Sequence, residues 1–382
     1  MKRIYLDYAA TTPVEPEVVE VMLPYFRQQF GNASSIHRFG LEAKKELDHA
    51  RGILARALNA EPREIVFTGG GTEANNLALL GTVFRSDAPG HLITSSIEHP
   101  SVRRTCEYLQ KKGWRVTFLR VDAFGMVHPE ELEKAIQPDT RLISIMYVNN
   151  EVGTINPIKA LAEIAKKHGI PFHTDAVQAF AKLKIDVREV PVSMLSLAAH
   201  KIYGPKGVGA LYVRRGVPLQ SVLIGGSQEF ALRPGTENLP GIVGLAKAVE
   251  IYERRREQDW QHIQALADWL LERLREEIPE AVLNGHPEQR YPGVLNLSFP
   301  GLENMALVMG LDLEGIAVSN GSACSSGKVE PSHVLQAMRL PRSVQQSAIR
   351  ISLGRYTTRE EVEHLIAALK KLTQNKIKAG RS

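Results

Sequence analysis

The sequence predicts an α/β protein whose main sheet is mostly parallel, in one large domain with a smaller one beside it. Short apolar runs alternate with amphipathic stretches along the first half of the chain. Several of these runs end in polar residues, as strands do where they lead into a ligand site. The length of 382 residues, with 43% apolar and 23% charged residues, permits a sizeable core and two domains.

The elements of the first half follow from hydrophobic periodicity. A short strand is expected at 4–8, followed by amphipathic helices at 16–30 and 38–58. Later strands are expected at 64–68, 91–95, 115–121, 141–148, 171–174 and 190–197. Helices are expected between them at 73–81, 100–112, 129–136 and 158–168. Such alternation predicts parallel strands joined by covering helices.

The second half reads differently, because residues 241–278 form one long helical stretch. We place the domain change within it, with a large domain at 15–255 and a small domain made of 1–14 and 256–382. The small domain is expected to contain strands at 294–299 and 348–353 and helices at 307–315 and 360–372.

Charge and cysteine content exclude several classes of protein. The net charge of +5 is spread along the chain, which favours a solvated surface over a nucleic-acid face. Two distant cysteines, Cys106 and Cys324, make neither a disulfide framework nor a four-ligand zinc site. The N-terminus has no apolar signal region, and no run approaches the ~18 apolar residues of a membrane span. A cytoplasmic location is the simplest expectation.

A glycine-rich turn follows the strand predicted at 64–68. Gly69, Gly70, Gly71 and Thr72 stand between that strand and a helix, an order that makes an anion site because N–H groups at a helix start attract phosphate. The dinucleotide fingerprint is incomplete, since the third glycine is missing. Tight packing without a ligand stays open for this turn.

Lys201 stands where the apolar run 190–197 opens into a turn at Gly204-Pro205. A lysine there loses hydration unless it is neutral, paired or covalently used, and a neutral amine can form an imine with an aldehyde cofactor. On its own the motif also fits a surface turn. A ligand site becomes the better interpretation because other predicted strand ends carry polar residues too, namely Thr72, His99, Asn150, Asp175 with Gln178, and His200.

A set of motifs in fixed order resembles the cysteine desulfurases, NifS/IscS-like members of the class-V aminotransferase family. The motifs are Leu6-Asp-Tyr-Ala-Ala-Thr-Thr12, Thr68-Gly-Gly-Gly-Thr-Glu-Ala74, Glu98-His99, Val148-Asn-Asn-Glu151, Asp175-Ala-Val-Gln178, His200-Lys201 and Gly321-Ser-Ala-Cys-Ser-Ser326. The resemblance runs from about Tyr5 to the last helix. It implies the aspartate-aminotransferase fold (fold type I, with a seven-stranded sheet), the cofactor pyridoxal 5′-phosphate (PLP) and a homodimer.

The resemblance also implies a role for each matching residue. Lys201 would hold PLP as a Schiff base, Asp175 would pair with the pyridine nitrogen, and His99 would stack on the ring and move protons. The remaining roles are contacts to the ring hydroxyl by Gln178 and Asn150, to the phosphate by Gly71, Thr72 and His200, to the partner's phosphate by Thr236, and to the substrate by Asn150, Arg350 and Asn32. Singly, His99 also fits a helix start, Asp175 a strand-end cap and Arg350 a surface ion pair.

Cys324 indicates the reaction. By resemblance its thiolate attacks the sulfur of L-cysteine, which gives L-alanine and a Cys324 persulfide that passes sulfur to an acceptor. The acceptor is expected to be an iron–sulfur scaffold or a tRNA-thiolation enzyme. The resemblance makes the second an equal candidate, because relatives that supply scaffolds often carry an extra C-terminal docking segment and this sequence ends at Ser382, soon after the last helix. Ala198 stands where the family has a phosphate-binding serine, so one phosphate hydrogen bond is expected to be missing.

Two alternatives stay open from the sequence. An aminotransferase or a selenocysteine lyase would share the fold and would act without Cys324. A non-catalytic subunit of a sulfur-transfer complex would hold no cofactor.

Overall fold

The computed structural model describes residues 3–86, 88–320 and 331–379, and in this part of the chain the strands form three sheets. The largest sheet has seven strands in the order β2-β8-β7-β6-β5-β3-β4. These strands are β2 Ile65–Thr68, β3 His91–Ser95, β4 Arg115–Leu119, β5 Thr140–Ser144, β6 Phe172–Asp175, β7 Met194–Ala198 and β8 Gly209–Val213. A three-stranded sheet contains β9 Val282–Asn284, β10 Val294–Ser298 and β12 Ala348–Ser352, and a two-stranded one contains β1 Ile4–Tyr5 and β11 Ile316–Ala317.

The large sheet is mostly parallel, which confirms the predicted fold class. The pairs from β4 to β7 are parallel, whereas β8 runs antiparallel to both of its neighbours, β7 and β2. Every residue of β2, β3, β6, β7 and β8 is buried, because helices cover both faces of the sheet. The sequence did not predict β8, which follows the Gly204-Pro205 turn closely enough to pass for a loop.

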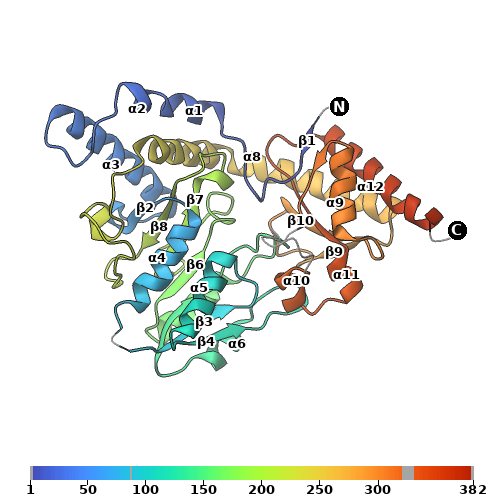
Figure 1. Cartoon of the computed structure of the whole chain (residues 1–382), viewed down its shortest axis with the longest axis horizontal. Coiled ribbons are helices and arrows are strands. Elements are labelled where there is room, and N and C mark those ends of the chain that lie inside the picture. Colours follow the sequence, from blue (N-terminus) through green and yellow to red (C-terminus); the bar gives the residue numbers. More distant parts are fainter. Residues whose placement is uncertain (1–2, 87, 321–330, 380–382) are drawn as a thin grey trace.

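Helices flank the large sheet in two groups (Figure 1). On one face, α4 Gly71–Val83 and α5 Pro100–Lys111 share a core with β2, β3 and β8. The helices of the other face are α3 Arg38–Leu58, α6 Pro129–Ala135, α7 Ile158–Lys167 and the first half of α8 Leu239–Glu277. Two short helices, α1 Pro16–Met22 and α2 Pro24–Arg27, pack against α8.

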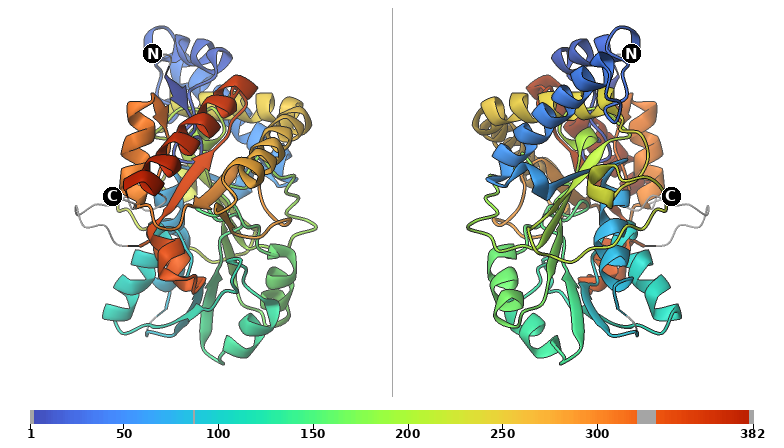
Figure 2. Two further views of the ribbon diagram at one scale, coloured as in Figure 1. Left: turned by 90° about the vertical axis from the view of Figure 1, so that its right-hand side faces the viewer. Right: turned by 90° about the vertical axis from the view of Figure 1, so that its left-hand side faces the viewer.

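A second hydrophobic core lies around the three-stranded sheet. It joins Ile4 and Leu6 of the N-terminal segment to the second half of α8, to β10 and β12, and to α9 Asn304–Leu313 and α12 Arg359–Ala379. Figure 2 shows α8, α9 and α12 around this sheet. The short helix α10 His333–Ala337 packs on the first core through Val334 and Leu335, and α11 Arg342–Gln346 contacts β10. Within α8, Tyr252 belongs to the first core and Ile263 to the second, and the expected domain change at 255–256 falls between them.

The helix expected at 16–30 differs from the structure. It is divided into α1 and α2, because Pro24 has no N–H to continue the hydrogen-bond ladder of α1. The strand expected at 4–8 is also shorter than expected, since β1 spans only Ile4–Tyr5. None of the helices in the described ranges is both long and apolar enough to cross a bilayer.

Candidate active site

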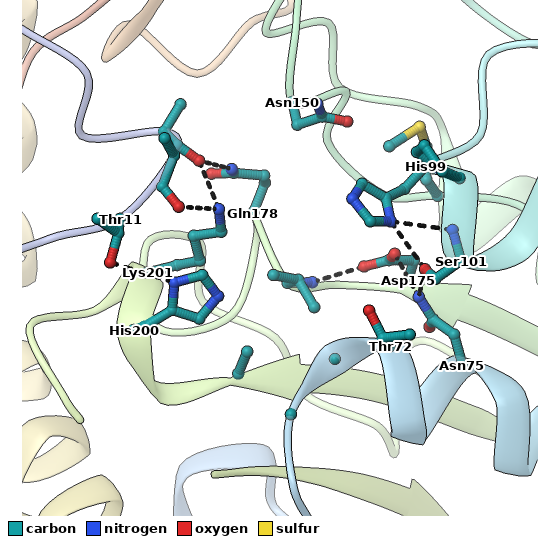
Figure 3. Close-up of a pocket in the computed structure, with 18 of the residues that line it drawn as sticks. Thr11, Thr72, Asn75, His99, Ser101, Asn150, Asp175, Gln178, His200 and Lys201 are labelled. Atoms are coloured by element: carbon teal, nitrogen blue, oxygen red, sulfur yellow. Dashed lines mark hydrogen bonds between the residues drawn. The ribbon is translucent and has the colours of Figure 1, made fainter. Parts of the chain in front are cut away.

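A cavity of about 1350 Å³ opens at the carboxyl ends of the parallel strands, on the side of the large sheet that faces the second core. The large sheet contributes residues that follow β2, β3, β5, β6 and β7, and the N-terminal segment and β12 supply the opposite wall. The cavity is lined by most of the expected site residues: Gly71, Thr72, His99, Asn150, Asp175, Gln178, His200, Lys201 and Arg350. Figure 3 shows how most of these side chains converge.

Lys201 stands at the end of β7, in a short 3₁₀ turn at Ala199–Lys201. Its Nζ donates to the backbone carbonyl oxygens of Ala9, at 2.6 Å, and Ala10, at 2.7 Å. Burial, with a smaller contribution from the charge of Arg350, lowers the pKa of Lys201 to about 8. A larger fraction of this amine is therefore neutral near physiological pH than of an ordinary lysine amine.

Asp175 is buried at the end of β6, across the cavity from Lys201 (Figure 3). One carboxylate oxygen accepts from Asn75 Nδ2 at 2.7 Å, and the other accepts from the backbone N–H of Val177 at 3.0 Å. Two donors fix the carboxylate while leaving acceptor capacity toward the cavity.

His99 caps the N-terminus of α5 and also lines the cavity, so the capping alternative and the site role are compatible. Its Nδ1 accepts from the backbone N–H of Ser101 at 3.2 Å and lies 2.8 Å from Ser101 Oγ. Because Nδ1 accepts, a neutral ring carries its proton on Nε2. Burial lowers the pKa of His99, as does the charge of Lys201, whereas Asp175 acts in the opposite direction.

Asn75 joins the two groups just described. Its Nδ2 donates to Asp175 and also to Ser101 Oγ, at 2.8 Å, which in turn contacts His99. A single amide therefore fixes the distance between the carboxylate and the imidazole. The Oδ1 atom of Asn75 is buried and has no hydrogen-bond partner among the described residues.

The start of α4 forms the floor of the cavity. Gly70 has a φ of +148°, which favours glycine, and a Cβ built there would meet no atom within 4 Å. The first N–H groups of a helix have no acceptor within the helix, so this end suits an anion. His200 Nδ1 lies 3.3 Å from Thr11 Oγ1, and burial and the charge of Lys201 lower the pKa of His200 to about 4.

Ala198 and Ser196 occupy different surroundings in β7. Ala198 lines the cavity, whereas Ser196 Oγ lies 2.9 Å from Nε2 of the buried His173 on the neighbouring strand β6. No hydroxyl from this stretch of β7 reaches the start of α4 in the described structure.

Two of the expected residues that the structure describes, Thr236 and Asn32, do not line this cavity. Thr236 and Asn32 are exposed, and Asn32 Oδ1 accepts from the backbone N–H of Ser34 at 2.9 Å. Cys324 lies outside the described residues. The described residues on either side of its segment, Ser319 and Pro331, both line the cavity.

These residues fit PLP. An amine with a lowered pKa, a fixed carboxylate and a glycine-rich helix start match an aldehyde, a pyridine nitrogen and a phosphate respectively. The cavity volume leaves room for an amino acid beside such a cofactor.

Sequence reasoning did not assign roles to Asn75 or Asp7, which also contribute to the site. Asn75 follows Thr72 by three residues, so the two share a helix face, and that spacing was a usable signal. Asp7 lies inside a quoted motif, but its ion pair with Arg350 joins residues far apart in sequence.

Comparison with known proteins identifies the class. Residues 4–365 match the model of the class-V aminotransferase family, to which the chain belongs. It is 46% identical over 376 residues to the cysteine desulfurase IscS of Dictyoglomus turgidum, covering 98% of this chain and 95% of the relative. Within the family the chain is one of the PLP-dependent, IscS-like cysteine desulfurases.

Solved structures agree with this membership. A NifS-like protein superposes with a TM-score of 0.92 at 38% identity, covering 98% of this chain and all of the other. The structure of SspA in complex with cysteine has a TM-score of 0.83 at 40% identity and covers 94% of this chain and all of SspA.

Proposed function

We propose that this protein removes sulfur from L-cysteine, releases L-alanine and carries the sulfur as a persulfide on Cys324. The carbon–sulfur bond of the substrate breaks, a sulfur–sulfur bond forms at Cys324, and the carbon that lost sulfur gains a proton. The convergence of Lys201, Asp175, His99 and Arg350 on one cavity, in a chain of this family, carries the proposal. When bound, PLP supplies an electron sink for the bonds at the substrate α-carbon.

Lys201 serves as the attachment point and then as the base. Its Nζ accepts the α-proton of the substrate, which requires a neutral amine. The lowered pKa of about 8 supports this role. The carbonyls of Ala9 and Ala10 hold Nζ in the cavity between proton transfers.

The other polar residues bind and orient. Asp175, fixed by Asn75 and Val177, would hold the pyridine N–H. His99 would present its Nε2 proton to the cavity, while Gln178 and Asn150 would contact the ring hydroxyl. The phosphate-binding residues would be Gly71, Thr72 and His200. Arg350 and Asn150 would bind the substrate carboxylate.

Cys324 would supply the nucleophile. The position of Ser319 and Pro331 on the cavity wall supports this role, because the segment between them starts and ends beside the site. A thiolate is needed for attack, so its pKa should fall below the ordinary value of about 8.5 when it lies near a cationic group such as Arg350.

We further propose a homodimer. Exposed apolar side chains gather on α2, the loop after it, the start of α3 and the segment 223–230, namely Phe26, Phe30, Ile36, Phe39, Leu41, Leu223, Ile224 and Phe230. Figure 1 shows these segments at one end of the molecule, and Arg51 of α3 pairs with Glu229 of the loop. Such a surface needs a partner of its own kind. It also carries Thr236 and Asn32, whose expected ligands would then lie in the partner's cavity.

The experiment is mass spectrometry of the PLP-loaded protein after incubation with L-cysteine. One added sulfur on Cys324, matched by alanine release, is expected. Cys324→Ser should abolish turnover but keep substrate-dependent absorbance changes, and Lys201→Ala should abolish both. Full turnover by Cys324→Ser would contradict the persulfide role. The enzyme that carries the added sulfur is then mixed with an iron–sulfur scaffold or with a tRNA-thiolation protein. Mass spectrometry of each mixture shows which acceptor takes the sulfur.

A further inference from the structure

A second lysine, Lys182, is buried behind the cavity and has no part in the mechanism above. It is 6% exposed and does not line the cavity. Its Nζ donates to Gln178 Oε1 at 2.7 Å and lies 4.8 Å from the centre of the Tyr291 ring. Lys182 follows Gln178 by four residues, and both stand in the turn after β6.

Burying a lysine at this position costs free energy of folding, because its ammonium group loses hydration. Burial lowers the pKa of Lys182 to about 7, with smaller contributions from the charges of Lys201 and Arg350. An apolar residue of similar volume would avoid this cost and keep the contact with Tyr291. The hydrogen bond to Gln178 is therefore the feature that only a polar side chain supplies.

That hydrogen bond decides which end of the Gln178 amide faces the cavity. The lysine amine donates in both of its protonation states, and in the structure its Nζ donates to the amide oxygen of Gln178. On the other side, Gln178 Nε2 donates to the Ala9 carbonyl at 2.9 Å. The reversed amide would place two oxygens face to face at Ala9 and two sets of donors at Lys182. Both neighbours thus demand the same orientation.

The consequence reaches the reactive lysine. The Ala9 carbonyl accepts from Gln178 Nε2 and also from Lys201 Nζ, so the three side chains are connected through it, in the order Lys182–Gln178–Ala9–Lys201 (Figure 3 labels Gln178 and Lys201). The second hydrogen of Gln178 Nε2 remains for a ligand. A fixed N–H donor stabilises an oxygen in its anionic form.

We propose that Lys182 is a positioning residue, which holds the Gln178 amide so that its N–H, and not its oxygen, faces the ring hydroxyl of PLP. This inference rests on the proposed function. It predicts that Lys182 keeps that oxygen anionic and so lowers the pH at which the Schiff base at Lys201 loses its proton.

The test is a pH titration of the visible imine band of the PLP-loaded protein. Lys182→Met is expected to raise the apparent pKa of the band by about one unit, the size of one hydrogen bond to a charged form. Gln178→Leu should raise it similarly, and the double variant should add nothing further. Lys182→Arg, which keeps a donor, should restore the wild-type titration. Lys184→Met changes an exposed lysine two residues away and is the matched control.

Each other outcome contradicts the inference. An unchanged titration in Lys182→Met would exclude positioning, and an equal shift in the Gln178→Leu background would show that Lys182 acts through its charge alone. If Lys182→Met does not fold, Lys182→Leu, which also lacks a donor, replaces it in the same cycle. A wild-type protein without an imine band contradicts the proposed function itself, whereas a normal band that Lys182 does not shift contradicts only this inference.

Discussion

Buried Arg350 and half-buried Asp7 form an ion pair on the cavity wall, with Arg350 Nη2 2.8 Å from an oxygen of Asp7. The other terminal nitrogen, Nη1, donates to the Asn150 carbonyl at 3.0 Å. The Nε atom is buried and has no partner among the described residues. Arg350 is therefore not the surface ion pair that the sequence left open. The pair fixes the guanidinium, which keeps donor capacity for an anionic ligand.

The first prediction concerns this fork. Arg350→Lys replaces a planar guanidinium by a single ammonium and should raise KM for L-cysteine about tenfold with a smaller change in kcat, because two-point binding of the carboxylate is lost. Steady-state alanine release measures both constants. Arg38→Lys, at an exposed pair with Glu42, should leave them unchanged. A wild-type KM in Arg350→Lys would remove Arg350 from the substrate site.

The second prediction concerns the pH dependence of PLP attachment. Because the pKa of Lys201 is lowered to about 8, about a tenth of its amine is neutral at neutral pH, far more than for an ordinary lysine. The rate of imine formation by the cofactor-free protein should rise tenfold per pH unit below about pH 8 and level off above it. Absorbance after mixing with PLP at a series of pH values measures the rate. A rise that continues unbroken to about pH 10 would mean that burial does not shift this amine.

The third prediction concerns Glu98, which is fully buried beside His99. One of its oxygens accepts from Ser95 Oγ at 2.5 Å and from the Met146 N–H at 2.9 Å, whereas the other has no partner in the described structure. Burial raises the pKa of Glu98 to about 8. The folded state thus binds a proton that the unfolded state has lost above its ordinary pKa, so the contribution of Glu98 to stability declines as pH rises toward 8.

Glu98→Gln removes this titration while keeping the shape and the two accepted bonds. Its free energy of unfolding should match that of the wild type near pH 5 and exceed it by roughly 2–4 kcal/mol near pH 8. Urea unfolding at the two pH values measures the difference. Glu131→Gln, at an exposed pair with Lys134, is the control and should show no such dependence. Equal effects at both pH values would mean that Glu98 is ionised in the folded protein.

The site illustrates what the sequence can and cannot predict. Strand ends were predictable, because apolar runs bounded by polar residues mark them, and Lys201, Asp175 and His99 were found in this way. Contacts between distant segments leave no such pattern. The Asp7–Arg350 pair depends on the segment after β1 lying beside β12, where Asp7 forms a bridge with Ser352, and no local spacing encodes this contact.

A different kind of contact was missed although its spacing was visible. Lys182 follows Gln178 by four residues, as Asn75 follows Thr72 by three, and both spacings place two side chains on one face of a turn or helix. A lysine within an apolar stretch also suggests a surface position until burial is known. In the structure Lys182 is buried instead, because Tyr291, from a segment more than a hundred residues away, covers it.

The segment that leads to Thr236 is anchored by a buried ion pair. Glu229 accepts from both terminal nitrogens of Arg51, at 2.6 and 2.7 Å, and from the Phe67 N–H at 2.7 Å. Glu229, Phe230 and Ala231 have φ values of 47°, 59° and 61°, a left-handed turn that costs about 1–2 kcal/mol per residue. Arg51 also lies between the rings of Phe67 and Phe230. The pair therefore offsets the strain and holds the apolar loop in one conformation.

The fourth prediction follows from this anchor. Glu229→Gln leaves a buried guanidinium without its counter-ion and should lower the free energy of unfolding by about 3–5 kcal/mol. It should also shift the protein from dimer toward monomer on dilution, because the loop bearing Leu223 and Ile224 loses its fixed shape. Urea unfolding and sedimentation velocity at several concentrations measure the two effects. Glu42→Gln breaks an exposed pair with Arg38 and should change stability by less than about 0.5 kcal/mol. If Glu229→Gln is less stable but remains as dimeric as the wild type, the Arg51–Glu229 ion pair does not support the proposed interface.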